Sequence, residues 1–162
     1  MINVRDSVFN LLNTLQGVGV YHSSVDPIKA DKYPIINIQT ERVTRKQIAD
    51  NFVFRNSCDL LVVVCVATTS LDFDAQLDAL VYSIETKILT DSVWNMSYES
   101  VPEIVTEYGY AQAGEQDLAV AKMRWSVKYT EVFDPNLTHI FDTAGVIIKD
   151  HPDVETIIHP IY

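Results

Sequence analysis

The spacing of hydrophobic residues predicts two main helices. Apolar side chains recur at helical intervals over residues 2–15, and again over a stretch that begins near Ser70 and continues to about residue 90. Gly17 and Gly19 would end the first helix. Each segment therefore predicts an amphipathic helix that packs one face against a hydrophobic core.

Alternation of apolar and polar residues predicts a first long strand at residues 34–44. This period of two places Ile36, Ile38, Thr40 and Arg42 on one face of the strand. The following residues, 42–51, are polar and basic and separate this strand from another that begins near Phe52. They predict a protruding hairpin arm rather than an element of the core.

The remaining strands are predicted by one apolar run and one long alternating segment. The valine-rich stretch "CDLLVVVCVAT", residues 58–68, is typical of a central strand covered on both faces. Residues 103–132 predict two strands joined by the turn "AGEQD". In the second of these, the alternation gives one apolar face and one basic face, the latter with Lys122, Arg124 and Lys128.

The order of helices and strands predicts an α+β fold, with a mixed or antiparallel β-sheet packed against two main helices. A length of 162 residues is typical of one domain, so we expect a single α+β domain over residues 1–162. Residues 134–162 are expected to be a C-terminal extension, and their short apolar runs are long enough for one or two edge strands.

The charge and composition of the sequence argue against some classes of function. The sequence is 48% hydrophobic and has a formal net charge of −10, which argues against a surface built to neutralise nucleic-acid phosphates or anionic lipids. The longest apolar run, residues 60–67, is too short for a membrane-spanning helix. We find no signal-peptide pattern at the start of the sequence and expect a cytoplasmic protein.

Three aspartates near the start of the second helix are candidate metal ligands. Asp72, Asp74 and Asp78 lack the loop glycine and the twelfth-position glutamate of a calcium-binding loop. With Ser70 as the N-cap, they instead fit the first turns of a helix, where the helix dipole stabilises negative charge. We therefore predict a structural role and no metal.

The other residue types that carry chemistry are scattered. Cys58 and Cys65 are separated by an odd number of residues, so in one strand they point to opposite faces and should not pair. The histidines show no metal-ligand spacing: they are His22, His139, His151 and His159. The sequence also lacks a nucleophile elbow and a phosphate-binding loop. It predicts no enzyme, catalytic residue or cofactor; a small metal-dependent enzyme that uses the aspartates and C-terminal histidines is the weaker alternative.

Positive charge is concentrated in two segments of this acidic chain. One interpretation is a solvated loop and a solvated sheet face. The other is a protein interface that meets an acidic surface on another subunit or partner. The candidate interface residues are Arg42, Arg45, Lys46, Lys122, Arg124 and Lys128.

The order of these segments resembles the tail terminator, or tail completion, proteins of long-tailed bacteriophages. The resemblance covers about residues 2–132 and rests on "VRDSVFNLLNTL", "PIINIQTE", the valine-rich strand and "LAVAKMRWSVKYT". Its most characteristic part is a helix of the form D-x-x-L-D-x-x-x-x-x-I-E-x-x-I, with Asp74, Leu77, Asp78, Ile84, Glu85 and Ile88. The segment after Phe133 is longer than the simplest members of this family need.

The resemblance implies a structural virion protein. Such proteins form a hexameric ring that caps the tail tube, ends tube polymerisation and provides the head–tail joining surface. The expected partners are further copies of the chain, the tail tube protein and the head–tail connector protein; the expected location is the virion tail, after assembly in the host cytoplasm. A connector or neck ring protein is the nearest alternative.

DNA is expected to pass through the ring without specific binding. The net charge of −10 favours a channel lined by carboxylates, which would repel the genome and keep its passage fast. The alternative is a channel lined by basic residues such as Lys122 and Arg124, with the acidic residues on the outside.

Overall fold

The computed structural model describes residues 3–22, 33–49, 52–69, 71–113 and 116–133. The described elements, in chain order, are α1 (Val4–Leu12), β1 (Gly19–His22), β2 (Ile35–Ala49), β3 (Val53–Ala67), α2 (Phe73–Leu89), α3 (Ser92–Ser97), β4 (Ser100–Ala113) and β5 (Gln116–Val132). The extension predicted at 134–162 lies outside the described residues. None of the described helices is long and apolar enough to span a membrane.

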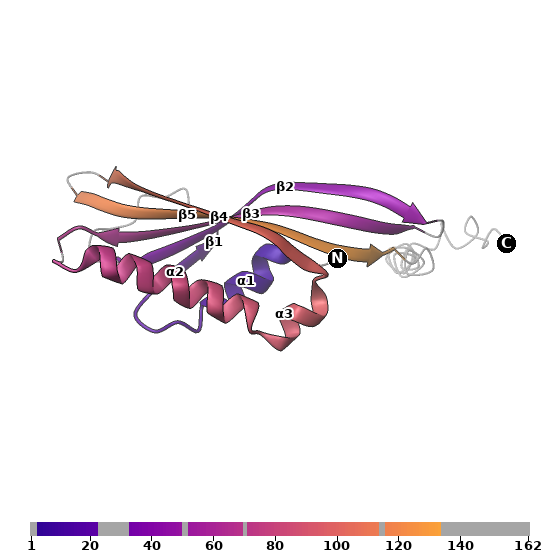
Figure 1. Ribbon diagram of the computed structural model, residues 1–162, viewed down its shortest axis with the longest axis horizontal. Helices are drawn as coiled ribbons and strands as arrows, with labels where there is room; N and C mark the ends of the chain where they lie inside the picture. The colour runs from indigo at the N-terminus through magenta and orange to yellow at the C-terminus, as the bar shows by residue number, and fades with distance from the viewer. Residues whose placement is uncertain (1–2, 23–32, 50–51, 70, 114–115, 134–162) are drawn as a thin grey trace, which may run out of the picture.

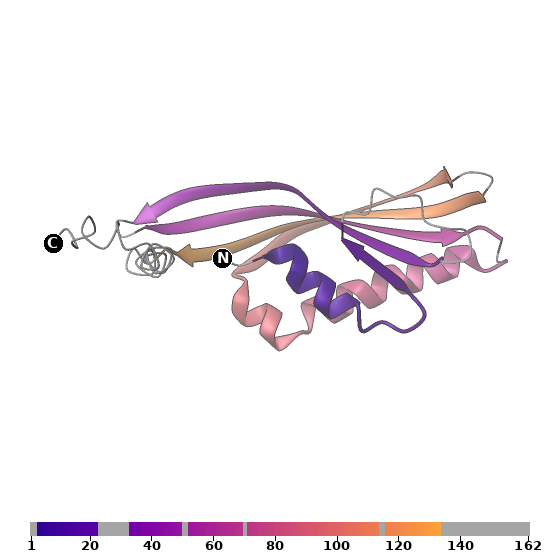
Figure 2. The same cartoon turned by 180° about the vertical axis from the view of Figure 1, so that it is seen from behind.

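The strands form a five-stranded mixed sheet in the order β1-β2-β3-β5-β4. β1 pairs parallel to β2, and the other neighbours pair antiparallel. All three described helices lie against the same face of this twisted sheet (Figures 1 and 2). The predicted α+β fold is confirmed. Below, "helix-side face" denotes the face that carries the helices, and "helix-free face" denotes the other, to which Leu61 and Val63 of β3 belong.

The core lies between the helices and the helix-side face. On β3 and β5, alternate residues enter it, so that Leu60 lies opposite Trp125 and Val62 opposite Met123. α1 and α2 cover these strands with one buried stripe each: Val4, Val8 and Leu12, and Leu77, Val81, Ile84 and Ile88. The prediction that β3 is covered on both faces is therefore only half right, because Leu61 and Val63 on the helix-free face are merely half-buried.

Two helix boundaries differ from the prediction. α2 begins at Phe73 with Asp72 at the N-cap position, so Ser70 is not the cap, and Leu71, expected in the apolar stripe, is fully exposed. α3 was not predicted. Its N-cap is Asp91, whose Oδ1 accepts a hydrogen bond of 2.7 Å from the Trp94 backbone N–H. Trp94 anchors this short helix in the core.

β2 and β3 continue past the helices as a hairpin arm, which we define as residues 41–49 and 53–59. Residues 126–132 of β5 form its third strand. The arm projects beyond α3 from the body of the molecule (Figure 1). Every residue of its β2 strand is exposed. The predicted protruding hairpin is confirmed, although β2 runs to Ala49 and leaves only a short turn.

Candidate protein interface

All predicted interface cations except Arg45 lie on the helix-free face. Lys122, Arg124 and Lys128 alternate along β5 with buried residues of the core. In the arm, Arg42 lies opposite Asp59, and Lys46 lies opposite Arg55. Both of these β3 residues belong to the helix-free face, so the two cations do too. Arg45 lies opposite Asn56 instead and so points to the helix-side face.

A β-bulge corrects the predicted orientation of Arg42. Uninterrupted alternation would place Arg42 on the same face as Ile38, which is buried in the core. The register of β2 with β3 shifts between Thr40 and Arg42, which leaves Glu41 as the extra residue. Because one extra residue reverses the side-chain alternation, Arg42 reaches the helix-free face.

Carboxylates neutralise part of this charge, so the helix-free face is mixed rather than basic. Arg42 Nη2 lies 2.7 Å from Asp59 Oδ2, and Arg124 Nη1 lies 2.8 Å from Glu107 Oε2. Arg124 also lies 3.7 Å from Glu41. Among the described residues, Lys46 and Lys122 form no ion pair. A surface that carries both positive and negative charges favours a partner whose charges have the opposite sign at the matching positions. Net attraction between the two surfaces contributes less.

The far end of the arm is apolar and exposed. Ile48, Phe52 and Val132 are 44%, 52% and 64% exposed, respectively. The Phe133 backbone N–H donates to the Phe52 carbonyl at 3.0 Å, and the Phe54 and Phe133 rings meet edge to face. Phe52 has a φ of 59°, which a large side chain rarely adopts. A constrained aromatic residue at an exposed tip is suited to insertion into a partner's surface.

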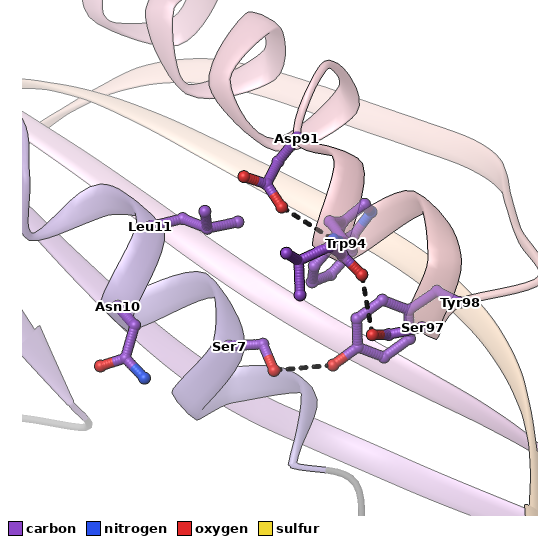
Figure 3. A pocket seen from close by; sticks show the side chains of 8 residues that line it. Ser7, Asn10, Leu11, Asp91, Trp94, Ser97 and Tyr98 are labelled. Carbon is purple, nitrogen blue, oxygen red and sulfur yellow. Dashed lines mark hydrogen bonds between the residues drawn. The ribbon is translucent and has the colours of Figure 1, made fainter.

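A pocket of about 330 Å³ lies between α1 and α3 (Figure 3). Several polar side chains that line the pocket form hydrogen bonds within the protein. The Tyr98 hydroxyl lies 2.9 Å from Ser7 Oγ, which itself donates to the Asn3 carbonyl at 3.1 Å. Asp91 caps α3. Burial raises the pKa of Tyr98 against the opposing effect of its bond to Ser7, so the phenol is neutral at physiological pH. The side chains of Ser7, Asp91 and Tyr98 are thus held in contacts within and between α1 and α3.

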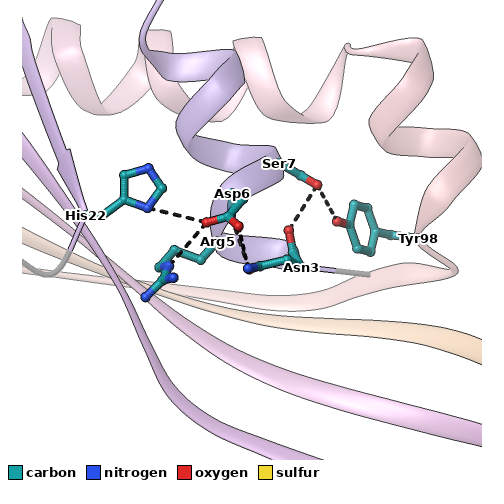
Figure 4. Close-up of polar contacts among 6 residues, drawn as sticks. All are labelled: Asn3, Arg5, Asp6, Ser7, His22 and Tyr98. Atoms are coloured by element: carbon teal, nitrogen blue, oxygen red, sulfur yellow. Dashed lines mark hydrogen bonds and ion pairs between the residues drawn. The ribbon is translucent and has the colours of Figure 1, made fainter. Parts of the chain in front are cut away.

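A polar cluster beside this pocket contains the one described histidine (Figure 4). His22 Nδ1 lies 3.4 Å from Asp6 Oδ1, and the His22 ring contacts the Phe9 ring at a tilt of 46°, with centroids 3.7 Å apart. Asp6 also accepts from Asn3, the N-cap of α1, and lies 3.5 Å from Arg5. These contacts link β1 to the start of α1. The other histidines lie outside the described residues.

The aspartates of α2 do not converge on a site. Asp74 and Asp78 are exposed, and no group of three or more histidine, cysteine, aspartate or glutamate side chains in the described part of the chain is placed to hold a metal. Burial raises the pKa of the Tyr108 phenol, and the negative charge of Asp78 raises it further. This link between α2 and β4 is invisible in the sequence, because it depends on how the helix lies across the sheet.

The two cysteines are free and lie on opposite faces of β3, as predicted. Cys58 is buried in the core, whereas Cys65 is only half-buried. Burial raises the pKa of both thiols to about 11, so neither carries a thiolate at neutral pH. Nucleophilic or metal-binding chemistry at these positions is therefore not favoured.

Comparison of the sequence with models of known protein families gives no match, and comparison with curated proteins gives no significant match.

Proposed function

We propose that this chain is a structural virion protein of the tail terminator type, which forms a ring on the end of a phage tail tube. The ring would end tube polymerisation and present a surface for the head–tail connector protein. This proposal combines the sequence resemblance with the geometry of the described residues.

The hairpin arm is the observation that carries the proposal. Its β2 strand is exposed along residues 41–49, and its tip exposes Ile48 and Phe52. An ordered strand pair that projects from the core and ends in apolar side chains is typical of a segment that binds a partner. The arm would contact the tail tube protein or an adjacent copy.

The chemistry of the described residues supports a structural role over an enzymatic one. The pocket residues Ser7, Asp91 and Tyr98 are engaged in helix contacts. Both cysteines are protonated at neutral pH because burial raises their pKa. The candidate interface cations lie on open sheet surface rather than in a cleft, so they can meet a second surface but do not enclose a small substrate.

A capping assay tests this function directly. Purified protein is added to purified tail tubes and to growing tubes, and its position and symmetry are determined by electron microscopy. We expect six-fold rings at one end of each tube and an end to elongation. Binding to connectors instead of tubes would identify a neck ring protein, and binding to neither would refute the proposal.

Charge reversal in the arm tests which part of the chain is responsible. Arg42→Glu, Arg45→Glu and Lys46→Glu together should leave the circular dichroism spectrum unchanged, because these side chains lie outside the core, but should reduce capping severely. Lys87→Glu, at the last turn of α2, is the control and should cap normally. Unchanged capping by the triple variant would show that the arm is merely solvated surface.

A further inference from the structure

Two edges of the sheet are open along most of their length. β4 has no strand on its outer side among the described residues, although it is 14 residues long. β1 covers the outer side of β2 only along Ile35–Ile38, which leaves residues 39–49 uncovered by any described strand. Each open edge presents a row of backbone N–H and C=O groups that a further strand can bind.

The two edges carry charges of opposite sign. β4 has Glu103 and Glu107 on the helix-free face and no basic residue. The open part of β2 has Arg42 and Lys46 on the same face, and Arg45 on the other. Glu41, at the bulge, is its one acidic residue. β4 against β4 would thus bring acidic residues together, whereas β4 against β2 would bring opposite charges together.

Strand direction and register also match. β4 runs antiparallel to β5, β5 to β3 and β3 to β2, so β4 is antiparallel to β2. A second copy placed beside the first with its strands aligned would therefore form an antiparallel pair. Arg42 and Glu103 lie in one row across the sheet, through Asp59 and Ser126, so pairing without a shift along the strands brings them side by side. In this register the contact joins about residues 39–45 of β2 to residues 100–106 of β4, because β1 already covers Ile35–Ile38.

We infer that the chain self-associates by adding the β2 edge of one copy to the β4 edge of the next, which continues the sheet from subunit to subunit. The contact joins two different edges, so it is heterologous, the type of contact that forms a ring when the rotation between copies closes and a filament when it does not. This inference rests on the ring of the proposed function and names the surface that holds it together. Glu103, which forms no ion pair with any described residue, becomes the partner of Arg42 in the next copy.

The competing explanation is that the edge charges keep the chain monomeric, because charged side chains on edge strands also prevent unwanted strand pairing. Protection works with any charge, including the same sign on both edges. Attraction between the edges requires opposite signs. Variants that reverse one edge at a time separate these two explanations.

The test uses two variants of the full chain, studied by sedimentation velocity over a range of concentrations. Glu103→Lys with Glu107→Lys makes both edges basic, and Arg42→Glu with Lys46→Glu makes both edges acidic. Each variant alone should self-associate at least about tenfold more weakly than the wild type, because like charges then face each other. An equimolar mixture should recover wild-type assembly, because each edge again meets its opposite in alternating copies.

Matched controls change the same number of charges away from the edges. Arg5→Glu with Lys87→Glu reverses two cations on α1 and α2, away from both edges, and should assemble like the wild type. Lys122→Glu with Lys128→Glu separately tests the helix-free face of β5, which is an interior strand. Asp74→Lys with Asp117→Lys is the control for the acidic pair. Glu103→Lys alone, which breaks no ion pair among the described residues, serves if the double variant fails to fold.

Recovery in the mixture, with normal assembly of the controls, would support the edge contact. A wild-type chain that is monomeric at every concentration, variants that assemble normally, or a mixture that stays dissociated would overturn it. Loss of assembly only in the Lys122 and Lys128 variant would show that the face, not the edge, makes the contact.

The edge contact and the proposed function can fail separately. If the edge contact fails while the wild type still caps tubes, the proposed function stands. If the mixture recovers assembly but no tube is capped, the edge contact stands without the proposed function.

Discussion

At the scale of single residues, one step along β3 decides between core and surface. Asn56, Cys58 and Leu60 point to the helix-side face and are buried, whereas Asp59 between them pairs with Arg42 on the helix-free face. Asn56 Nδ2 donates to Glu131 Oε2 at 3.2 Å, so the arm carries a buried polar contact next to the apolar core. Burial of Cys58 favours its neutral thiol form over the charged thiolate.

The raised thiol pKa values predict how stability depends on pH. Because burial raises the pKa of Cys58 and Cys65 from 9.0 to about 11, the unfolded chain loses these protons at lower pH than the folded chain. Their contribution is fully present below pH 9.0 and is lost as pH rises through about 11. Urea unfolding at pH 8 to 11 should show a decline, and Cys58→Val with Cys65→Val should reduce it. Rapid alkylation of the native thiols at pH 8 would contradict this explanation.

At the scale of elements, the long segments were predictable and the short helix α3 was not. The alternation of β5 over residues 119–130 and the stripe of α2 each extend through several turns or pleats, so their periods are visible. α3 has six residues, with Trp94 buried and Val93 and Met96 exposed, which is too short to establish a helical period. Its one local signal is the N-cap Asp91.

The N-cap of α3 is predicted to matter more than the acidic residue in the first turn of α2. Asp91→Ala removes the acceptor for the Trp94 N–H and should lower the free energy of unfolding by about 0.5–2 kcal/mol. Asp91→Asn keeps an acceptor and should cost less. Asp74→Asn should cost only about 0.3–1 kcal/mol, the size of a helix-dipole effect. Urea titrations measure all three; calcium-dependent melting that Asp74→Asn abolishes would instead indicate a metal site.

The candidate interface could be predicted only in part. The sequence identified the cations, because alternation along β5 separates Lys122 and Arg124 from the core. It could not identify their partners, since Arg124 reaches Glu41 and Glu107 from two other strands and those contacts depend on register. It also placed Arg42 on the wrong face, because no local pattern marks the bulge at Glu41.

At the scale of the whole molecule, the two faces of the sheet have different tasks. The helix-side face builds the core, and the helix-free face carries charges of both signs that remain accessible. With a net charge of −10 over the chain, we expect these few cations to attract DNA only weakly.

The charge balance predicts weak binding of duplex DNA. Fluorescence anisotropy of the assembled protein with a labelled duplex should show little binding even at about 50 mM salt, because few phosphates are neutralised and few counterions released. Tight binding that falls steeply with salt, and that Lys122→Glu with Arg124→Glu abolishes, would instead indicate a basic channel. The proposed ring would remain possible in either case.

The strand order β1-β2-β3-β5-β4 has a consequence for synthesis of the chain on the ribosome. β3 forms its hairpin with β2 soon after both are made, but its other side waits for β5, with α2, α3 and β4 in between. During that interval the most apolar strand of the protein has one unpaired side, the kind of surface that makes folding intermediates aggregate. Completion of the sheet centre therefore waits for β5, and truncation before Gln116 would leave one edge of the valine-rich strand unpaired.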